Sequence, residues 1–125
     1  MPVSFIEHQG QRILLLDFAR IRDPQIVLRE IEEARKFIAQ QPRRKELLTL
    51  ADVSKLRFND DVLKAFRELT KHDEPYEKAA AVFGLTTLGA VAFRANNFMT
   101  GGRLKGFEKK DDALKWLLEQ AASKS

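Results

Sequence analysis

Few residues of this 125-residue chain could perform acid–base or metal chemistry, and their spacing does not suit it. His8 and His72 have no second histidine or glutamate at metal-binding spacing, and we expect both side chains at the surface. The carboxylate pairs 60–61, 73–74 and 111–112 are sequence neighbours, so on a helix the two members point about 100° apart and cannot face one reacting atom. The chain has no cysteine, which excludes thiolate zinc sites and cysteine nucleophiles. We therefore predict no catalytic residue, no metal and no cofactor; an enzyme would require His72 or a carboxylate pair to converge in the fold.

A glycine-containing segment, Gly84–Gly89, occupies the place of a phosphate-binding loop. It follows the apolar run Ala79–Phe83 and opens a predicted helix, but it lacks the lysine and hydroxyl pair that such a loop needs, which excludes a nucleoside triphosphatase. What remains is a helix start with free backbone amides and the hydroxyls of Thr86 and Thr87, at the end of a strand where open α/β sheets bind ligands. Capping of the helix by Thr86 explains the same residues and is the favoured interpretation.

The remainder of the chain alternates between strand and helix patterns. Two β-rich runs around a short glycine-containing connection predict a hairpin, and Asp23-Pro24 begins the first helix. We predict strands at 3–8, 12–17, 46–53, 79–83 and 103–107, and helices at 24–41, from 59 to about 75, at 86–100 and from about 111 onward. The order ββαβαβαβα is a hairpin followed by three βα crossovers. It predicts a single α/β domain over residues 1–125 with an open, mostly parallel sheet.

Composition is typical of a soluble globular protein. Hydrophobic residues make up 44% and charged residues 32%, which is too apolar for a disordered segment. No run approaches about 18 apolar residues and the first residues do not resemble a signal peptide, so we expect a cytoplasmic protein without a membrane span. The net charge is +4, with basic clusters at 43–45 and within 94–110 that suit either an anionic partner or a solvated face. Nucleic acid ranks last among partners, because no stacking aromatic residues are interleaved with these charges.

The predicted helix 86–100 is the most informative element for interactions. Its inward face carries apolar residues at helical spacing, and Ala90 and Phe93 lie on the opposite side with few charges besides Arg94. A helix that is apolar nearly all round is usually covered on both sides. The second cover is another element of the domain, a partner chain or an apolar ligand, and the sequence leaves these alternatives open.

Four short motifs follow one another in the second half of the chain. They are Asp52-Val53-Ser54 at the end of a strand, 72–76 (HDEPY), 80–85 (AAVFGL), and Phe107 followed by 113–117 (ALKWL). In order and spacing they resemble the STAS-like group, specifically the SpoIIAA-like proteins related to bacterial anti-sigma-factor antagonists and, more distantly, the lipid-binding SEC14 domain. The resemblance covers the element order of the whole chain, and it implies a STAS-like fold and regulation through protein binding.

The resemblance also implies a position for a regulatory serine, at the start of the helix after the third strand, where a phosphate would repel the partner. This chain has Phe58-Asn59-Asp60-Asp61 there, without a hydroxyl, and Ser54 lies in the preceding loop. Asp60 or Asp61 could act as a fixed mimic of the phosphorylated state, but helix capping and dipole stabilisation are the favoured explanation. Whether Ser54 is phosphorylated stays open.

We predict a non-catalytic regulatory or protein-interaction module of STAS-like type in a bacterial cytoplasm. Its interaction surface would lie at the helix starts after the third and fourth strands, with a self-association contact for a homodimer on the following helix: Asn59, Asp60, Asp61, Thr86, Thr87 and Phe93. The alternative, which the distant SEC14 resemblance implies, is a carrier or sensor of a small apolar or amphiphilic, lipid-like ligand with an anionic head. Its pocket would lie between the helix 86–100 and the sheet, lined by Phe83, Phe98 and Met99, with Arg94 or Arg103 meeting the head.

Overall fold

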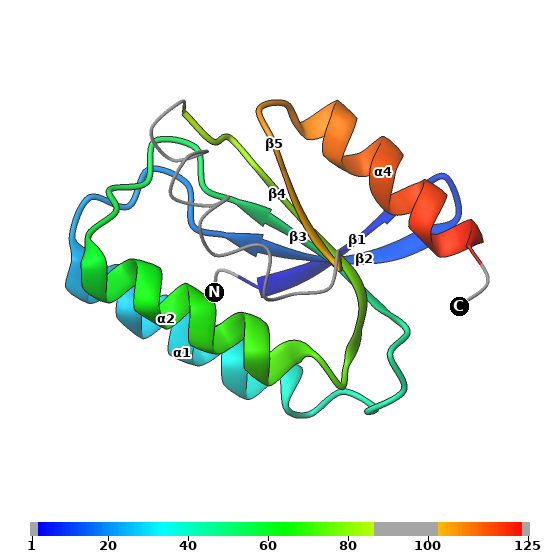
Figure 1. The fold of residues 1–125 in the computed structure, drawn as a ribbon, viewed down its shortest axis with the longest axis horizontal. Coiled ribbons are helices and arrows are strands. Elements are labelled where there is room, and N and C mark those ends of the chain that lie inside the picture. Colours follow the sequence, from blue (N-terminus) through cyan, green and yellow to red (C-terminus); the bar gives the residue numbers. More distant parts are fainter. Residues whose placement is uncertain (1–2, 87–102, 124–125) are drawn as a thin grey trace.

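The computed structural model describes residues 3–86 and 103–123 (Figure 1). The elements in chain order are β1 (Val3–His8), β2 (Gln11–Asp17), α1 (Pro24–Ile38), β3 (Leu47–Asp52), α2 (Asp60–Asp73), β4 (Glu77–Phe83), β5 (Leu104–Phe107) and α4 (Lys110–Ala122). The predicted α/β order is confirmed for every element within these ranges. The predicted helix 86–100 lies outside the described residues, apart from Thr86.

The five strands form one mixed sheet whose spatial order is the sequence order β1-β2-β3-β4-β5. β1 and β2 pair antiparallel as the predicted hairpin, with His8 opposite Gln11 next to the turn. β2, β3, β4 and β5 pair parallel, with Leu14, Thr49 and Ala80 in one row across the sheet. The hairpin followed by a parallel sheet is therefore confirmed.

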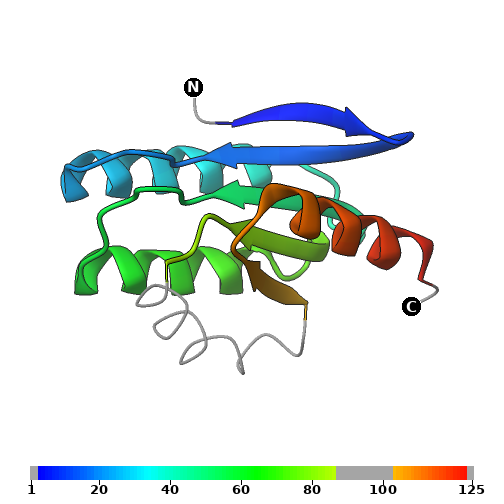
Figure 2. The ribbon, with the colours of Figure 1, turned by 90° about the horizontal axis from the view of Figure 1, so that it is seen from above.

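Helices cover both faces of the sheet. α1 and α2 lie side by side on one face and α4 lies on the other (Figures 1 and 2). α1 turns Val27, Ile31, Ala34 and Ile38 toward the sheet, a spacing of three and four residues that keeps them on one side of the helix. α4 contributes Ala113, Leu114 and Leu117 to the second layer.

This double cover explains the continuous apolar runs in the strands. Alternate side chains of β2 enter opposite layers, so Leu14 packs beneath α1 and α2 while Ile13 packs in the layer with α4. Both side chains are fully buried. Most residues of the runs 13–16 and 79–83 are therefore buried, on whichever face of the sheet they lie.

Local capping chemistry sets the helix starts. The Asp23 side chain accepts a hydrogen bond from the Gln25 amide, and Pro24 occupies the first turn. The Asn59 side chain accepts from the Val62 amide at 2.8 Å, so Asn59 caps α2 as predicted. The first helix ends at Ile38 rather than at Gln41, because the chain leaves the helix in hydrogen-bonded turns before Pro42.

The fourth strand starts earlier than its apolar run suggests. β4 begins at Glu77, two residues before the predicted start at Ala79, and Glu77 is paired with Leu47 of β3. A glutamate is a poor strand signal on its own, because charged side chains are seldom buried in a sheet. Its position in the strand brings a carboxyl group into the interior.

The loop after β3 and the loop after β4 approach each other closely at Ser54 and Gly84. Gly84 has a φ of +87°, and a Cβ atom placed on it would overlap Ser54 Oγ and lie 2.7 Å from Ser54 N. The amide of Val53 donates to the carbonyl of Phe83 beside this contact. Position 84 therefore needs glycine for its conformation and for the space that Ser54 occupies.

Alanine at position 84 should destabilise the protein more than alanine at Gly10, which also has a positive φ but has nothing within 4 Å of the position that a Cβ atom would take. G10A tests the conformational cost alone, about 1 kcal/mol. We expect G84A to lower the free energy of unfolding by at least about 2 kcal/mol more, because the overlap involves backbone atoms. Urea denaturation of both variants measures this difference, and equal costs would contradict the close approach.

Candidate functional site

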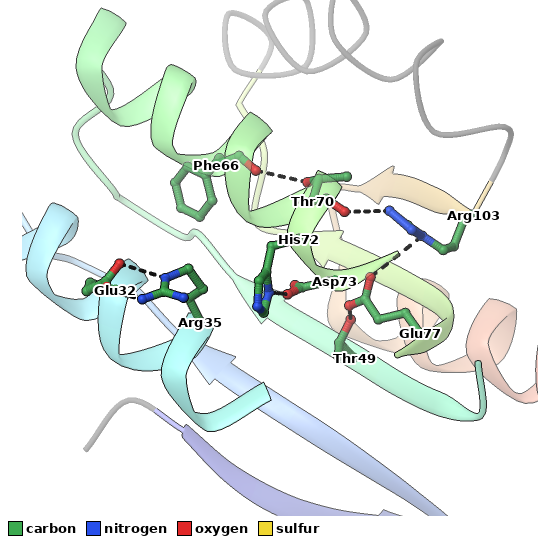
Figure 3. A network of polar contacts seen from close by, with 9 residues as sticks. All are labelled: Glu32, Arg35, Thr49, Phe66, Thr70, His72, Asp73, Glu77 and Arg103. Carbon is green, nitrogen blue, oxygen red and sulfur yellow. Dashed lines mark hydrogen bonds and ion pairs between the residues drawn. The ribbon is translucent and has the colours of Figure 1, made fainter. Parts of the chain in front are cut away.

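A cluster of polar side chains lies inside the protein where α2 ends and β4 begins (Figure 3). Asp73 is the last residue of α2 and Glu77 is the first residue of β4. Thr49 comes from the middle of β3, and Arg103 directly precedes β5. The short connection between α2 and β4 thus brings two carboxyl groups to the layer beneath the helix.

Hydrogen bonds and one ion pair join the members of this cluster (Figure 3). Thr49 Oγ1 donates to Glu77 Oε2 at 2.5 Å. The Arg103 guanidinium donates to the carbonyl of Thr70 at 2.8 Å, and its Nε lies 3.7 Å from Glu77 Oε1. Arg103 Nε is buried and makes no hydrogen bond to any described residue. Arg103 therefore ties the end of α2 to the start of β5 and sets a positive charge beside Glu77.

Burial makes these carboxyl groups weaker acids than exposed ones. The side chains of Asp73 and Glu77 are 5% and 3% exposed, so hydration offsets little of the cost of ionising them. Burial raises the pKa of Asp73 to about 7, although the charge of Arg103 lowers it in part. Burial and the neighbouring Asp73 charge raise the pKa of Glu77 to about 8, against the opposing effects of Thr49 and Arg103. Both groups consequently titrate near neutral pH.

His72 is part of the same cluster and is half-buried, whereas the sequence predicts a surface residue. Its Nδ1 lies 2.8 Å from Asp73 Oδ1, and its ring stacks on Tyr76 with centroids 5.5 Å apart. The side chain is 22% exposed, and burial is the main cause that lowers the pKa of His72, followed by the charge of Arg35. A histidine and two carboxyl groups therefore lie in one cluster, but of the two carboxyl groups His72 contacts only that of Asp73, and it does not line the cavity beside the cluster.

A cavity of about 120 Å³, here called the central cavity, lies beside this cluster between α2 and the sheet. Asp73, Glu77, Thr49, Thr70 and Arg103 lie at its polar end. Most of the rest of its described wall is apolar, from α2, the loops and the sheet, and includes Leu16, Phe18, Ala51, Val53, Phe58, Leu63, Phe66, Leu69, Ala80, Val82 and Leu85. A mostly apolar pocket with a few convergent polar groups is the usual form of a small-molecule site.

The predicted interaction residues that the structure describes lie at one end of the sheet. Asn59, Asp60 and Asp61 form the exposed start of α2, and exposed Thr86 follows β4. The strands β3 and β4 are parallel, so their carboxyl ends bring these residues to the same edge of the sheet. Thr87 and Phe93 lie outside the described residues.

The predicted pocket residues are divided by the sheet. Arg103 lines the central cavity, but Phe83 packs in the layer with α4 and does not line it. The cause is strand alternation, which turns Phe83 to the same face as Ala81 and Ala79. Arg94, Phe98 and Met99 lie outside the described residues.

The proximity of Asp73 and Glu77 is not evident from the sequence, in which the two residues are not neighbours. Two residues that are four positions apart usually lie on one face of a helix. Here, however, Asp73 ends a helix and Glu77 begins a strand. A usable signal is the polar residue within each apolar strand, Thr49 in β3 and Glu77 at the start of β4. Polar groups buried in neighbouring strands must find partners, and these two are partners of each other.

Comparison with solved structures identifies the fold. An uncharacterized protein of the DUF3478 family with a SpoIIAA-like fold, from Shewanella loihica, is 25% identical over 92% of this chain and 91% of its own, with a TM-score of 0.61. A serine-to-glutamate variant of RsbS from Moorella thermoacetica has a TM-score of 0.67 at 14% identity, covering 98% and 100% of the two chains. An anti-sigma-factor antagonist (STAS) domain protein from Planctomyces limnophilus has a TM-score of 0.50 at 14% identity, covering 96% and 98%.

These likenesses establish that the chain has the STAS-like, or SpoIIAA-like, fold, as the resemblance predicted. No protein-family model matches the sequence, and no curated protein matches it. Within residues 3–86 and 103–123, no group of three histidine or acidic side chains could hold a metal ion. None of the helices in these ranges is long and apolar enough to cross a membrane.

The buried carboxyl groups should make stability depend on pH. Both pKa values are higher in the folded protein than in the unfolded chain, so the folded state binds more protons between about pH 4 and about pH 8. This contribution to stability is fully present below the ordinary carboxyl pKa and is lost as the pH rises through about 7 and about 8. At about 1.4 kcal/mol for each pH unit between pH 5 and each folded-state pKa, we expect the free energy of unfolding to fall by on the order of 5 to 7 kcal/mol between pH 5 and pH 9.

Urea denaturation at several pH values measures this loss in the wild type, in E77Q and in E68Q. Glutamine at position 77 cannot ionise, so E77Q should show a flatter profile. Glu68 is an exposed carboxylate on α2, so E68Q should keep the wild-type profile. A wild-type profile that is flat from pH 5 to pH 9 would show that the carboxyl groups titrate normally.

Proposed function

We propose that this chain is a non-catalytic regulatory module that binds another protein through the edge of its sheet where the parallel strands end. The loops that follow β2, β3, β4 and β5 form this edge, here called the carboxyl edge. The observation that carries the proposal is that these loops are joined to one another by backbone hydrogen bonds. A surface held in this way needs little ordering when a partner binds.

The hydrogen bonds run from loop to loop along the carboxyl edge. After β2, the Arg20 amide donates to the Ser54 carbonyl at 2.7 Å, and the Arg57 amide donates to the Ile21 carbonyl at 3.1 Å. After β4, the Gly84 amide donates to the Glu108 carbonyl at 3.2 Å. Together with the contact of Gly84 and Ser54, these bonds connect all four loops.

The start of α2 is the acidic centre of this edge. Asn59 uses its side chain to cap the helix, whereas Asp60 and Asp61 are exposed in the first turn. Their carboxylates stabilise the positive end of the helix dipole and also present negative charge to solvent. A basic patch on a partner would complement them.

The names of two fold neighbours support a regulatory role for this surface. One is an anti-sigma-factor antagonist domain protein, and the other is an RsbS variant in which a serine is replaced by glutamate. In the SpoIIAA-like pattern the regulatory serine stands at the start of this helix, where this chain has Asn59, Asp60 and Asp61. We propose that Asp60 and Asp61 keep this helix start negatively charged at all times, and that the protein works in a bacterial cytoplasm without a phosphorylation switch there.

Charge reversal at the start of α2 should abolish partner binding. We expect D60K/D61K to lose the proteins that the wild type retains in quantitative affinity capture and cross-linking from cells of its source. E33K/E119K is the charge-matched control, because it reverses two exposed carboxylates, on α1 and near the end of α4, that lie away from the carboxyl edge. Retention of the same proteins by D60K/D61K and the wild type would contradict the proposal.

The central cavity favours a second candidate function, a carrier or sensor of a small apolar or amphiphilic ligand. Its apolar wall and its polar end with Arg103 match the amphiphilic character predicted for such a ligand. Native mass spectrometry of the untagged protein separates the candidates. A persistent added mass supports the carrier, whereas a bare dimer supports a self-interacting module, for which F93E tests the predicted contact at Phe93.

A further inference from the structure

We propose that the central cavity binds a small amphiphile with a cationic head, of the size of a short primary alkylamine, whose ammonium group lies at Asp73 and Glu77. This inference rests on the second proposed function and specifies the ligand. It replaces the anionic, lipid-like ligand that the sequence suggested with one of opposite charge and smaller size. The cavity, the charges at its polar end and its apolar wall carry the argument.

The volume of the cavity limits the size of the group that it can enclose. A dry apolar cavity of about 150 Å³ holds one benzene molecule, so the 120 Å³ found here suits about four or five non-hydrogen atoms. A lipid tail contains several times as many non-hydrogen atoms. The ligand body is therefore a short alkyl group, which the apolar wall under α2 would bury.

The charges at the polar end favour a cation. Two buried carboxyl groups face a single buried guanidinium, so ionisation of both leaves one negative charge without a partner. A buried unpaired charge is costly, and a ligand ammonium group would supply the missing positive charge. A ligand carboxylate or phosphate would instead add a second unpaired negative charge.

Arg103 is not available as the anion-binding group that the sequence suggested. Its guanidinium already donates to the Thr70 carbonyl and lies beside Glu77. An anionic head would have to compete with Glu77 for it. A cationic head needs no such exchange, because it binds the carboxyl groups.

The other charged groups around the cavity do not compensate the excess of carboxyl groups over the guanidinium. Arg67, Lys71 and Glu74 also line it, but all three are exposed, so water and salt screen their charges. His72 lies against Asp73, and burial lowers the pKa of its imidazole. On α1, Glu32 and Arg35 form an exposed ion pair with each other, and β3 contributes only uncharged Thr49.

The proposal predicts that affinity for an amine rises with pH. The ammonium binds the ionised carboxyl groups, whose pKa values are about 7 and about 8. An alkylamine has a pKa near that of lysine, about 10.4, so it stays charged over this range. Lowering the pH from about 8.5 to about 6 should weaken binding by at least about 10-fold, because the carboxyl groups must lose their protons to bind the cation.

Three probes of similar size test the head group: n-butylamine, n-butanol and butyrate. Titrations followed by NMR chemical shifts at about pH 6 and about pH 8.5 give their affinities for the intact chain. We expect the amine to bind at least about 10-fold more tightly than the alcohol at the higher pH, and butyrate to bind most weakly. The E77Q variant should lose the preference for the amine but still bind butanol, whereas E68Q should behave as the wild type.

The possible failures separate the proposal from the function on which it rests. If butanol and butylamine bind equally in the cavity, the cationic head is wrong and the small-ligand function stands. If butyrate binds best, the ligand is anionic and the proposal is overturned. If no probe shifts the signals of cavity residues in the wild type, both the proposal and the small-ligand function fail. The comparison of probes uses the wild type, so it tests the proposal even if E77Q does not fold.

Discussion

The central strands of this sheet are shielded from water on both faces, and this constraint governs the rest of the structure. α1 and α2 cover one face and α4 covers the other, so β3 and β4 have no solvated side. An apolar residue satisfies this condition without a partner, but a polar residue does not. Thr49 and Glu77 therefore bond to each other, and Arg103 sits beside them. Within the described ranges, the only other buried polar residue is Asp73, at the end of α2.

The same parallel strands give the molecule two distinct ends. At the carboxyl edge, backbone hydrogen bonds join the loops into one surface with the acidic start of α2 exposed. At the opposite end of α2, the helix terminates over the buried carboxyl groups at the polar end of the central cavity, whose apolar wall runs beneath the helix. α2 thus spans both candidate sites. A ligand in the cavity would contact the helix whose other end faces the proposed partner, which gives the two proposed functions a shared element.

The fold is more predictable from the sequence than the site, and the difference has a physical cause. Alternation of apolar residues and the capping residues Asp23 and Asn59 are local signals, and they locate the strands and helix starts. The convergence of His72, Asp73, Glu77 and Arg103 depends on how a helix end, two strands and a loop meet, which no local spacing records. Phe83 shows the same limit, because its face of the sheet follows from strand alternation across the full register and not from its apolar neighbours. The acidic residues at the start of α2 are predictable because helix caps are local.

The central claim of this account is that two carboxyl groups are held in the interior with pKa values near neutrality. The most direct test is a pH titration of the side-chain carboxyl ¹³C signals of Asp73 and Glu77 by NMR in the wild-type protein. The account predicts coupled titrations centred near pH 7 and pH 8. Midpoints near about 4, the ordinary value for carboxyl groups, would show that both side chains are hydrated and would remove the basis for a charged site in the cavity.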